Sequence, residues 1–157
     1  MYNLRVIDKV GMPHVMLFIT EKLAEFDTKS VEWIKLLPLK KNTLLHGECK
    51  FPYKGATKNS KLDSGYRIRA SVNVMMCPPF SFAHWGREYF DTANISWKSV
   101  EKKFYFEDLE ECAVHTLAHE CFHFLSDSGQ VKEKNFEANA NWWGDLWLTE
   151  FKNNRRG

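Results

Sequence analysis

Apolar and polar residues alternate cleanly between Tyr66 and Val74. The apolar side holds Ile68, Ala70, Val72 and Val74, and the polar side holds Arg67, Arg69, Ser71 and Asn73. A period of two is typical of a half-buried strand. We therefore predict a strand here. We expect it to pair as a hairpin with an extended segment at 43–53, across a basic loop at 54–65.

Apolar residues spaced three or four apart predict helices in the first quarter of the chain. Pro13 suits the first turn of a helix over 13–26. The buried side of this helix would be Val15, Met16, Ile19 and Leu23. Ser30 is a suitable N-cap for a second, short helix over 31–37, which Pro38 would end.

A longer helix is predicted in the last third of the chain. It should begin near 106–108, where acidic residues suit the positive end of the helix dipole, and end near 126–129, where Gly129 is a natural stop. Its apolar side consists of Val114, Leu117, Ala118, Cys121 and Leu125. His119 and His123 fall on the opposite side of the helix, where a cleft could form.

A turn over 130–134 and another helix over 135–151 would complete an antiparallel helical hairpin. The tail 152–157 is polar and is expected to fray. These elements predict an α+β fold with N-terminal helices, a small, mostly antiparallel sheet and an antiparallel pair of C-terminal helices. A length of 157 residues suggests one domain, 1–157, that can bury a core.

Composition narrows the protein class only a little. Apolar residues make up 44% and charged residues 27%, as in ordinary globular proteins, and a net charge of +2 argues against a strong polyanion binder. Aromatic residues reach 15%, which predicts a core or groove built on rings. The aromatic stretch 80–99 has no regular period and is expected to be irregular. No signal peptide or membrane-spanning segment is visible, so we expect a cytoplasmic location.

The cysteines predict neither a zinc ribbon nor a redox site. The chain has 4 cysteines and no C-x-x-C pair. Cys112 and Cys121 lie on one helix but point to roughly opposite sides, so they cannot bridge each other. Reduced thiols are therefore expected.

The segment His119-Glu120-Cys121-Phe122-His123 is an H-E-x-x-H motif inside the long predicted helix. Side chains four residues apart lie on one helix face, one turn apart, so both imidazoles can share one ion. The intervening glutamate then lies beside that ion as a general base. We predict one Zn²⁺ per chain, with His119 and His123 as ligands and Glu120 as the catalytic residue. Two hydrogen-bonded histidines without a metal are the alternative.

A catalytic zinc usually has three protein ligands and keeps one position for water. Glu137 is the predicted third ligand, because equal rise along two antiparallel helices puts it level with His123. Asn141, one turn further on, comes level with His119 and is expected to hydrogen-bond the ring nitrogen that does not bind zinc. Two other acidic residues remain rival ligands: Asp127 and Glu133.

Three further residues are candidates for the cleft or for stabilising a transition state: His84, Tyr89 and His115. The first two are chosen by residue type alone. His115 lies one turn before His119 on the same face. A ligand from His115 or Cys112 is chemically allowed, but we expect His115 to be a cleft residue.

The run from Val114 to Leu148 resembles the gluzincin-type zinc metallopeptidases, in particular the small single-domain versions of bacteria and phages. The similar segments are V-H-T-L-A-H-E-C-F-H-F-L and N-F-E-A-N-A-N-W-W-G-D-L-W-L. In that family a zinc-binding Glu is followed four residues later by Asp. The corresponding positions here are Glu137 and Asn141, which keeps a hydrogen-bonding group without its charge. The metzincin continuation, Gly and then His, is absent because Ser126 and Gly129 stand there.

The resemblance implies a zincin-like fold, with a short sheet above the active-site helix and an edge strand that binds an extended peptide. Segment 66–76 would belong to that sheet. It also implies a mechanism, in which zinc polarises a water molecule and the scissile carbonyl while Glu120 moves the proton.

The predicted function is therefore hydrolysis of peptide bonds by a zinc metallopeptidase that acts on a protein or peptide. One alternative is a DNA-associated protease similar to the SprT-like proteases. It is suggested by a basic run: Lys50, Lys54, Lys58, Lys61, Arg67 and Arg69. The near-neutral net charge favours a solvated loop instead. The other alternative is a non-catalytic binding protein in which zinc only joins two helices.

Overall fold

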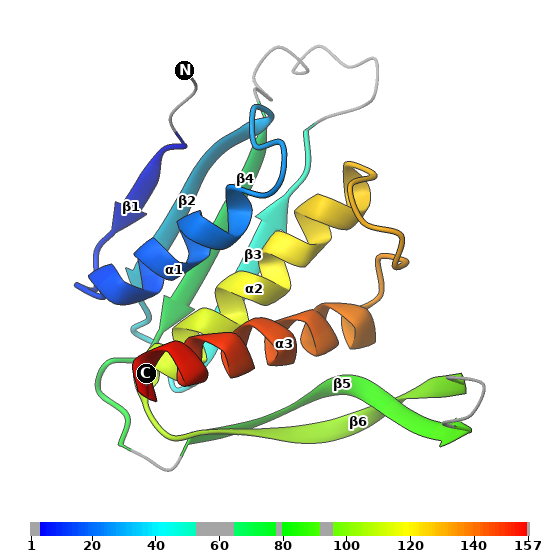
Figure 1. Ribbon diagram of the computed structural model, residues 1–157. Coiled ribbons are helices and arrows are strands. Elements are labelled where there is room, and N and C mark those ends of the chain that lie inside the picture. The colour runs from blue at the N-terminus through cyan, green and yellow to red at the C-terminus, as the bar shows by residue number, and fades with distance from the viewer. Residues whose placement is uncertain (1–3, 53–64, 78–79, 92–95, 157) are drawn as a thin grey trace.

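The structure, a computed structural model, describes residues 4–52, 65–77, 80–91 and 96–156. This part of the chain is mixed α+β, with three helices, a four-stranded sheet and a two-stranded hairpin (Figure 1). The elements are β1 (Val6–Asp8), α1 (Pro13–Leu23), β2 (Val31–Pro38), β3 (Leu45–Lys50), β4 (Tyr66–Val72), β5 (Phe80–Asp91), β6 (Ser96–Phe106), α2 (Leu109–Asp127) and α3 (Glu137–Arg156). Helices α1 and α2 cover one face of the sheet, and α3 separates α2 from the β5–β6 hairpin (Figure 1).

The four-stranded sheet has the order β1-β2-β4-β3. The predicted pairing of β3 with β4 is confirmed as antiparallel, with Leu45 opposite Val72. The expectation of a mostly antiparallel sheet is wrong for this sheet, because β1 pairs with β2 and β2 with β4 in parallel. The predicted strand β4 lies in the interior, and β3 is the edge strand on that side.

The helix predicted over 31–37 is wrong, because this segment is strand β2. Its pairing with β4 shifts register between Val31 and Trp33. Val31, Ile34 and Leu36 are all buried against the helices. A bulge adds one residue to a strand, so the first two of these lie three apart instead of two. That spacing imitates the period of a helix.

The stretch expected to be irregular, 80–99, is also wrong: it forms β5 and the start of β6. Phe82 on β5 stacks on Phe104 and Phe106 of β6, with ring centroids 5.3 and 5.6 Å apart. Beyond this end, Trp85 and Tyr89 are exposed. Because the hairpin buries only part of one face, its alternation is too short to stand out in the sequence.

The predicted helices α1 and α2 are confirmed. Pro13 opens α1, which ends at Leu23, before the expected Phe26. Asp108 caps α2 by accepting a hydrogen bond from the Glu111 backbone. At the other end Gly129 has φ +78°, and Gln130 N donates to Leu125 O at 2.9 Å. These contacts form a Schellman stop that L-residues with a Cβ disfavour.

Helix α3 is also confirmed, but it continues to Arg156. The tail was expected to fray from 152. Arg155 instead lies 2.9 Å from Asp108 and 3.1 Å from the buried Glu111. These ion pairs tie the end of α3 to the start of α2.

The core lies between the sheet and helices α1 and α2. It contains the apolar positions of β2 and β4 and the predicted apolar side of α2. The four cysteines are free thiols, as expected. No helix in the described ranges is both long and apolar enough to cross a bilayer.

Candidate metal centre

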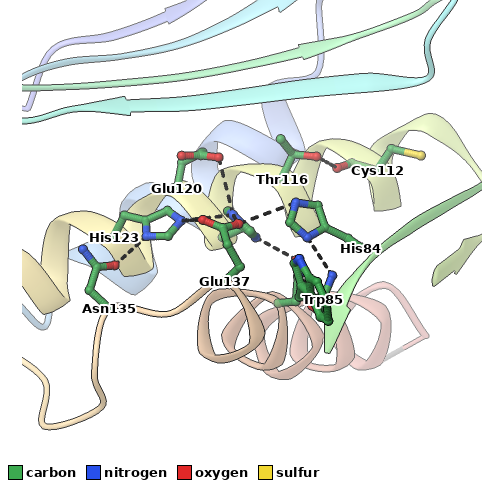
Figure 2. A network of polar contacts seen from close by, with 10 residues as sticks. His84, Trp85, Cys112, Thr116, Glu120, His123, Asn135 and Glu137 are labelled. Carbon is green, nitrogen blue, oxygen red and sulfur yellow. Dashed lines mark hydrogen bonds and ion pairs between the residues drawn. The ribbon is translucent and has the colours of Figure 1, made fainter. Parts of the chain in front are cut away.

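The α2–α3 hairpin brings two histidines and one glutamate to a common point. The Nε2 atoms of His119 and His123 lie 3.1 Å apart. Glu137, at the first turn of α3, places Oε2 3.0 Å from the first of these atoms and Oε1 3.1 Å from the second. Figure 2 shows Glu137 rising from α3 towards His123 on α2. The arrangement that equal rise along two antiparallel helices predicts is therefore present in the structure.

Hydrogen bonds determine which nitrogen of each ring carries a proton. Asn141 donates through Nδ2 to the Trp85 carbonyl, so its Oδ1, 2.7 Å from His119 Nδ1, must accept. Asn135 Oδ1 lies 2.6 Å from His123 Nδ1 in the same way. Both histidines thus donate through Nδ1. In their neutral form, both present a bare lone pair at Nε2.

This cluster of electron pairs needs a cation. Two Nε2 lone pairs and two oxygens of Glu137 meet within about 3 Å, and they repel one another unless a proton or a metal ion lies among them. With metal–ligand bonds of about 2.0–2.1 Å, atoms at the corners of a tetrahedron lie roughly 3.3 Å apart. The observed spacings are close to this value, so the donor set fits a small divalent ion.

Two carboxylates are near enough to be the third ligand. One ligand atom from each of His119, Glu120 and His123 lies within 4.8 Å of the others. Glu120 Oε1, however, is 3.7 Å from His119 Nε2, while Glu137 reaches both histidines at about 3 Å. Of the two carboxylates, Glu137 is therefore the better placed to complete a metal site with the two histidines, and Glu120 lies beside it.

Glu120 is buried between α2 and the edge strand β3. Gly47 of β3 passes directly over it: a Cβ there would lie 2.9 Å from Glu120 Cγ and 2.9 Å from Thr116 Cγ2. Figure 2 shows Glu120 on the β3 side of α2. Burial raises the pKa of Glu120, against the effect of the two histidines. A raised pKa makes this carboxylate a better proton acceptor near neutral pH.

The pKa of the Glu137 carboxyl shifts in the opposite direction to that of Glu120. When the rings are protonated, hydrogen bonds from His119 and His123 hold the pKa of Glu137 well below its usual range. Burial alone would lower the pKa of His123, but its hydrogen bonds to Glu137 and Asn135 raise it overall. His123 and Glu137 therefore form a charged pair when no metal ion competes with the protons.

The cluster opens into a cleft of about 660 Å³. Its lining residues come mainly from the edge strand β3, from β5, from α2 and from the first turns of α3. The lining residues that lie outside the cluster include Leu45, Gly47, Cys49, Phe51 and Phe82. This size is typical of a site for a small molecule or a short peptide segment.

The three other candidate residues have different surroundings. His84 of β5 lines the cleft with Nε2 3.5 Å from Glu137 Oε2, and burial lowers its pKa. His115 also borders the cleft but is fully buried among aromatic rings, with Nε2 3.1 Å from Asp145 Oδ1. It joins α2 to α3. Tyr89 does not line the cleft, and its hydroxyl accepts a hydrogen bond from Arg87.

The rival ligands lie elsewhere. Asp127 accepts a hydrogen bond of 2.6 Å from the Tyr66 hydroxyl. Glu133, whose carbonyl accepts from Ser126, does not line the cleft, nor does the buried Cys112. None of the three side chains is placed to complete the donor set.

Three contributors to the site were not identified from the sequence. Asn135 orients His123, Gly47 makes room for Glu120, and the Trp85 carbonyl orients Asn141. Asn135 lies two residues before Glu137, at the start of the predicted helix over 135–151, so the sequence did carry a signal for it. The other two come from strands whose approach to α2 and α3 has no local signature in the sequence.

Comparison with models of protein families, with curated proteins and with solved structures finds no match to this chain.

Proposed function

We propose that this protein is a zinc-dependent metallopeptidase of the zincin-like, gluzincin type. One observation carries the proposal: two histidine Nε2 lone pairs and the Glu137 carboxylate converge within 3.0–3.1 Å at the base of a cleft, with Glu120 beside them. A catalytic zinc site, unlike a structural one, has three protein ligands and a fourth position open to solvent. Here the three ligands would be two nitrogens and one carboxylate oxygen.

His119, His123 and Glu137 would hold the ion. A zinc ion bound here would act as a Lewis acid, which lowers the pKa of water and polarises a carbonyl. Asn141 and Asn135 keep both rings in the tautomer that ligation needs, because they accept from Nδ1.

Glu120 carries the proton. The oxygen of a water molecule forms a bond to the carbonyl carbon of the peptide, and the Glu120 carboxylate accepts one proton of that water. The carbon–nitrogen bond then breaks, and Glu120 returns the proton to the leaving nitrogen. One water is consumed, and a carboxylate and an ammonium group are released once the new acid has passed its proton to the new amine. Burial of Glu120 raises its pKa and so favours the first transfer.

The edge strand β3 suggests an extended peptide as substrate. Asn73 N donates to Leu44 O, so alternate residues from His46 onward bond to β4. The N–H and C=O groups of Leu45, Gly47 and Cys49 then point away from β4, along the wall of the cleft. A peptide could add to these groups as a further strand.

The direct test is Glu120→Gln in zinc-loaded protein. We expect cleavage of a mixture of quenched fluorescent peptides to fall by at least about 10²-fold, because the amide cannot accept the proton. Zinc content, measured by mass spectrometry, should stay at one ion per chain, since Glu120 is not a ligand. Glu21→Gln, at an exposed position of α1, is the matched control. Undiminished cleavage by the Glu120 variant would rule out the mechanism.

The two alternatives have less support. Arg67 and Arg69, part of the basic run, lie 2.7 and 2.5 Å from Glu32 and Glu48, which offsets their charge towards nucleic acid. The lysines at 54, 58 and 61 lie outside the described residues. A purely structural zinc would need a fourth protein ligand. Neither His115, engaged with Asp145, nor Cys112 reaches the cluster.

A further inference from the structure

His84 is a third histidine at the cleft and has no part in the ligand set. It projects from β5 on the side of the cluster nearer the hairpin, whereas Glu120 lies on the side nearer β3 (Figure 2). We infer that His84 is a catalytic residue that donates a hydrogen bond from Nε2 to the carbonyl oxygen of the bound peptide. This inference rests on the proposed function and adds one residue to it.

The backbone determines where the His84 proton lies. The Trp85 N–H donates to His84 Nδ1 at 2.8 Å. Because an N–H can only donate, Nδ1 must be the accepting nitrogen, and the neutral ring then carries its proton on Nε2. His84 therefore presents a donor to the cleft. It cannot present the lone pair that a metal ligand requires.

Trp85, which orients His84, also gives His119 the opposite tautomer. The Trp85 carbonyl accepts from Asn141 Nδ2, and this turns Asn141 Oδ1 towards His119 Nδ1. The two histidine rings are 5.7 Å apart. The N–H of Trp85 thus leaves His84 with a donor at Nε2. The C=O of Trp85, acting through Asn141, leaves His119 with a lone pair at Nε2.

The hairpin that carries Trp85 is fastened to α3 by Arg87. Its guanidinium lies over the rings of Trp97 and Trp142, at 4.6 and 4.1 Å from their centroids. Its Nε and Nη2 donate to Asn139 Oδ1 at 3.0 and 2.7 Å. Stacked and hydrogen-bonded arginines are well-ordered anchors. Arg87 is two residues from Trp85, so it holds the main chain that orients both histidines.

A donor at this position has a clear use. As water adds to the carbonyl carbon, negative charge develops on the carbonyl oxygen, and a preorganised N–H stabilises that charge. The side chain of His84 is 35% exposed, so a substrate can reach it. The competing role is to orient Glu137, whose Oε2 is 3.5 Å away. That contact is at the outer limit of a hydrogen bond.

The experiment compares His84→Phe and His84→Gln with wild type and with His14→Gln, a change on exposed α1. Phenylalanine keeps a ring but removes the donor, whereas the Gln amide offers a donor near the position of Nε2. The readouts are the zinc dissociation constant, from competition with a chromophoric chelator, and kcat and KM on quenched fluorescent peptides. We expect His84→Phe to lower kcat by about 10²–10³-fold. Zinc affinity and KM should change less than about threefold, and His84→Gln should recover part of kcat.

Other outcomes overturn the inference. If His84→Phe weakens zinc binding by about 10–100-fold while kcat per bound zinc is kept, His84 orients Glu137 instead. If both variants retain wild-type kcat, His84 has no catalytic role, although the proposed function stands. If zinc-loaded wild type cleaves nothing, the proposed function fails, and the role of His84 fails with it.

Discussion

At the scale of single residues, Asn141 performs two tasks at once. It accepts from His119 Nδ1 through its oxygen and donates to the Trp85 carbonyl through its nitrogen. A carboxylate can do only the first. An amide can do both, and here a strand carbonyl faces the same side chain and needs a donor.

We predict that Asn141→Asp destabilises the protein. The carboxylate would be buried, and the Trp85 carbonyl would lose its donor, which costs about 1–3 kcal/mol. Urea unfolding of metal-free protein measures the change, with Asn42→Asp at an exposed position as control. An unchanged unfolding free energy would show that the Trp85 carbonyl finds another donor.

Gly47 is a second residue whose role depends on close approach. A methyl group there would meet Glu120 and Thr116 at distances that real Cβ atoms essentially never show. Gly47→Ala should therefore displace the Glu120 carboxylate. We expect a loss of about 1–3 kcal/mol in stability and at least a tenfold fall in kcat, with one zinc still bound.

Gly86→Ala provides the matched control for this change. The three atoms nearest to its added methyl group would all belong to the exposed Lys102 side chain, which can move into solvent. Its stability, from urea unfolding, should therefore fall less than that of Gly47→Ala. Wild-type kcat in Gly47→Ala would mean that Glu120 is not held by the approach of β3.

At the scale of elements, the charges that hold α2 and α3 together at the cluster depend on whether a metal ion is bound there. Without metal, protonated His123 faces ionised Glu137. The raised pKa of His123 stabilises the fold below its ordinary value of 6.5, and this contribution is lost as pH rises. The lowered pKa of Glu137 stabilises the fold above its ordinary value of 4.5, and this contribution is lost as pH falls. Both contributions are complete only between these two values.

We therefore predict that metal-free and zinc-loaded protein respond differently to pH. From pH 6 to pH 8 the contribution of the cluster to the melting temperature of metal-free protein should fall, as His123 loses its proton. The increase in melting temperature on adding zinc should grow over the same range, because zinc needs the neutral rings. Differential scanning fluorimetry measures both. Glu137→Gln should flatten both trends, and an unaltered pH response in that variant would contradict the assignment.

At the scale of the whole molecule, three parts that share one core meet at the cleft. The sheet and α2 share the main core, α3 packs on α2 through contacts such as Phe122 with Trp143, and the β5–β6 hairpin is fastened to α3. Each part has apolar contacts that do not involve the cluster. The metal should therefore add to the stability of a protein that is already folded.

Removal of zinc by a chelator should lower the melting temperature without unfolding the protein at 25 °C. A ligand at 1,000 times its dissociation constant adds about 4 kcal/mol, which corresponds to roughly 10 °C for a chain of this length. Circular dichroism should retain its helical signal after chelation. The double variant His119→Ala, His123→Ala should not respond to zinc. Full unfolding on chelation would instead indicate a structural metal.

The sequence by itself determined the elements that depend on local signals. Helix α2 with its acidic start and its Gly129 stop, the β3–β4 hairpin and helix α3 follow from periods, charges and turns within short windows. The convergence of His119, His123 and Glu137 follows too, because helical rise is constant and a short turn fixes the register of two antiparallel helices.

Only the tertiary structure decided what depends on contacts between distant segments. A bulge gave β2 the spacing of a helix, and partial burial hid the alternation of β5. The tautomer of His119 depends on the Trp85 carbonyl of β5, which reaches Asn141 through the packing of β5 against α3. The N–H of the same residue orients the neighbouring His84. The motif therefore predicts which atoms can bind a metal ion. The fold decides which nitrogen of His119 carries a proton and what surrounds the cluster, because those contacts join segments that are far apart in the sequence.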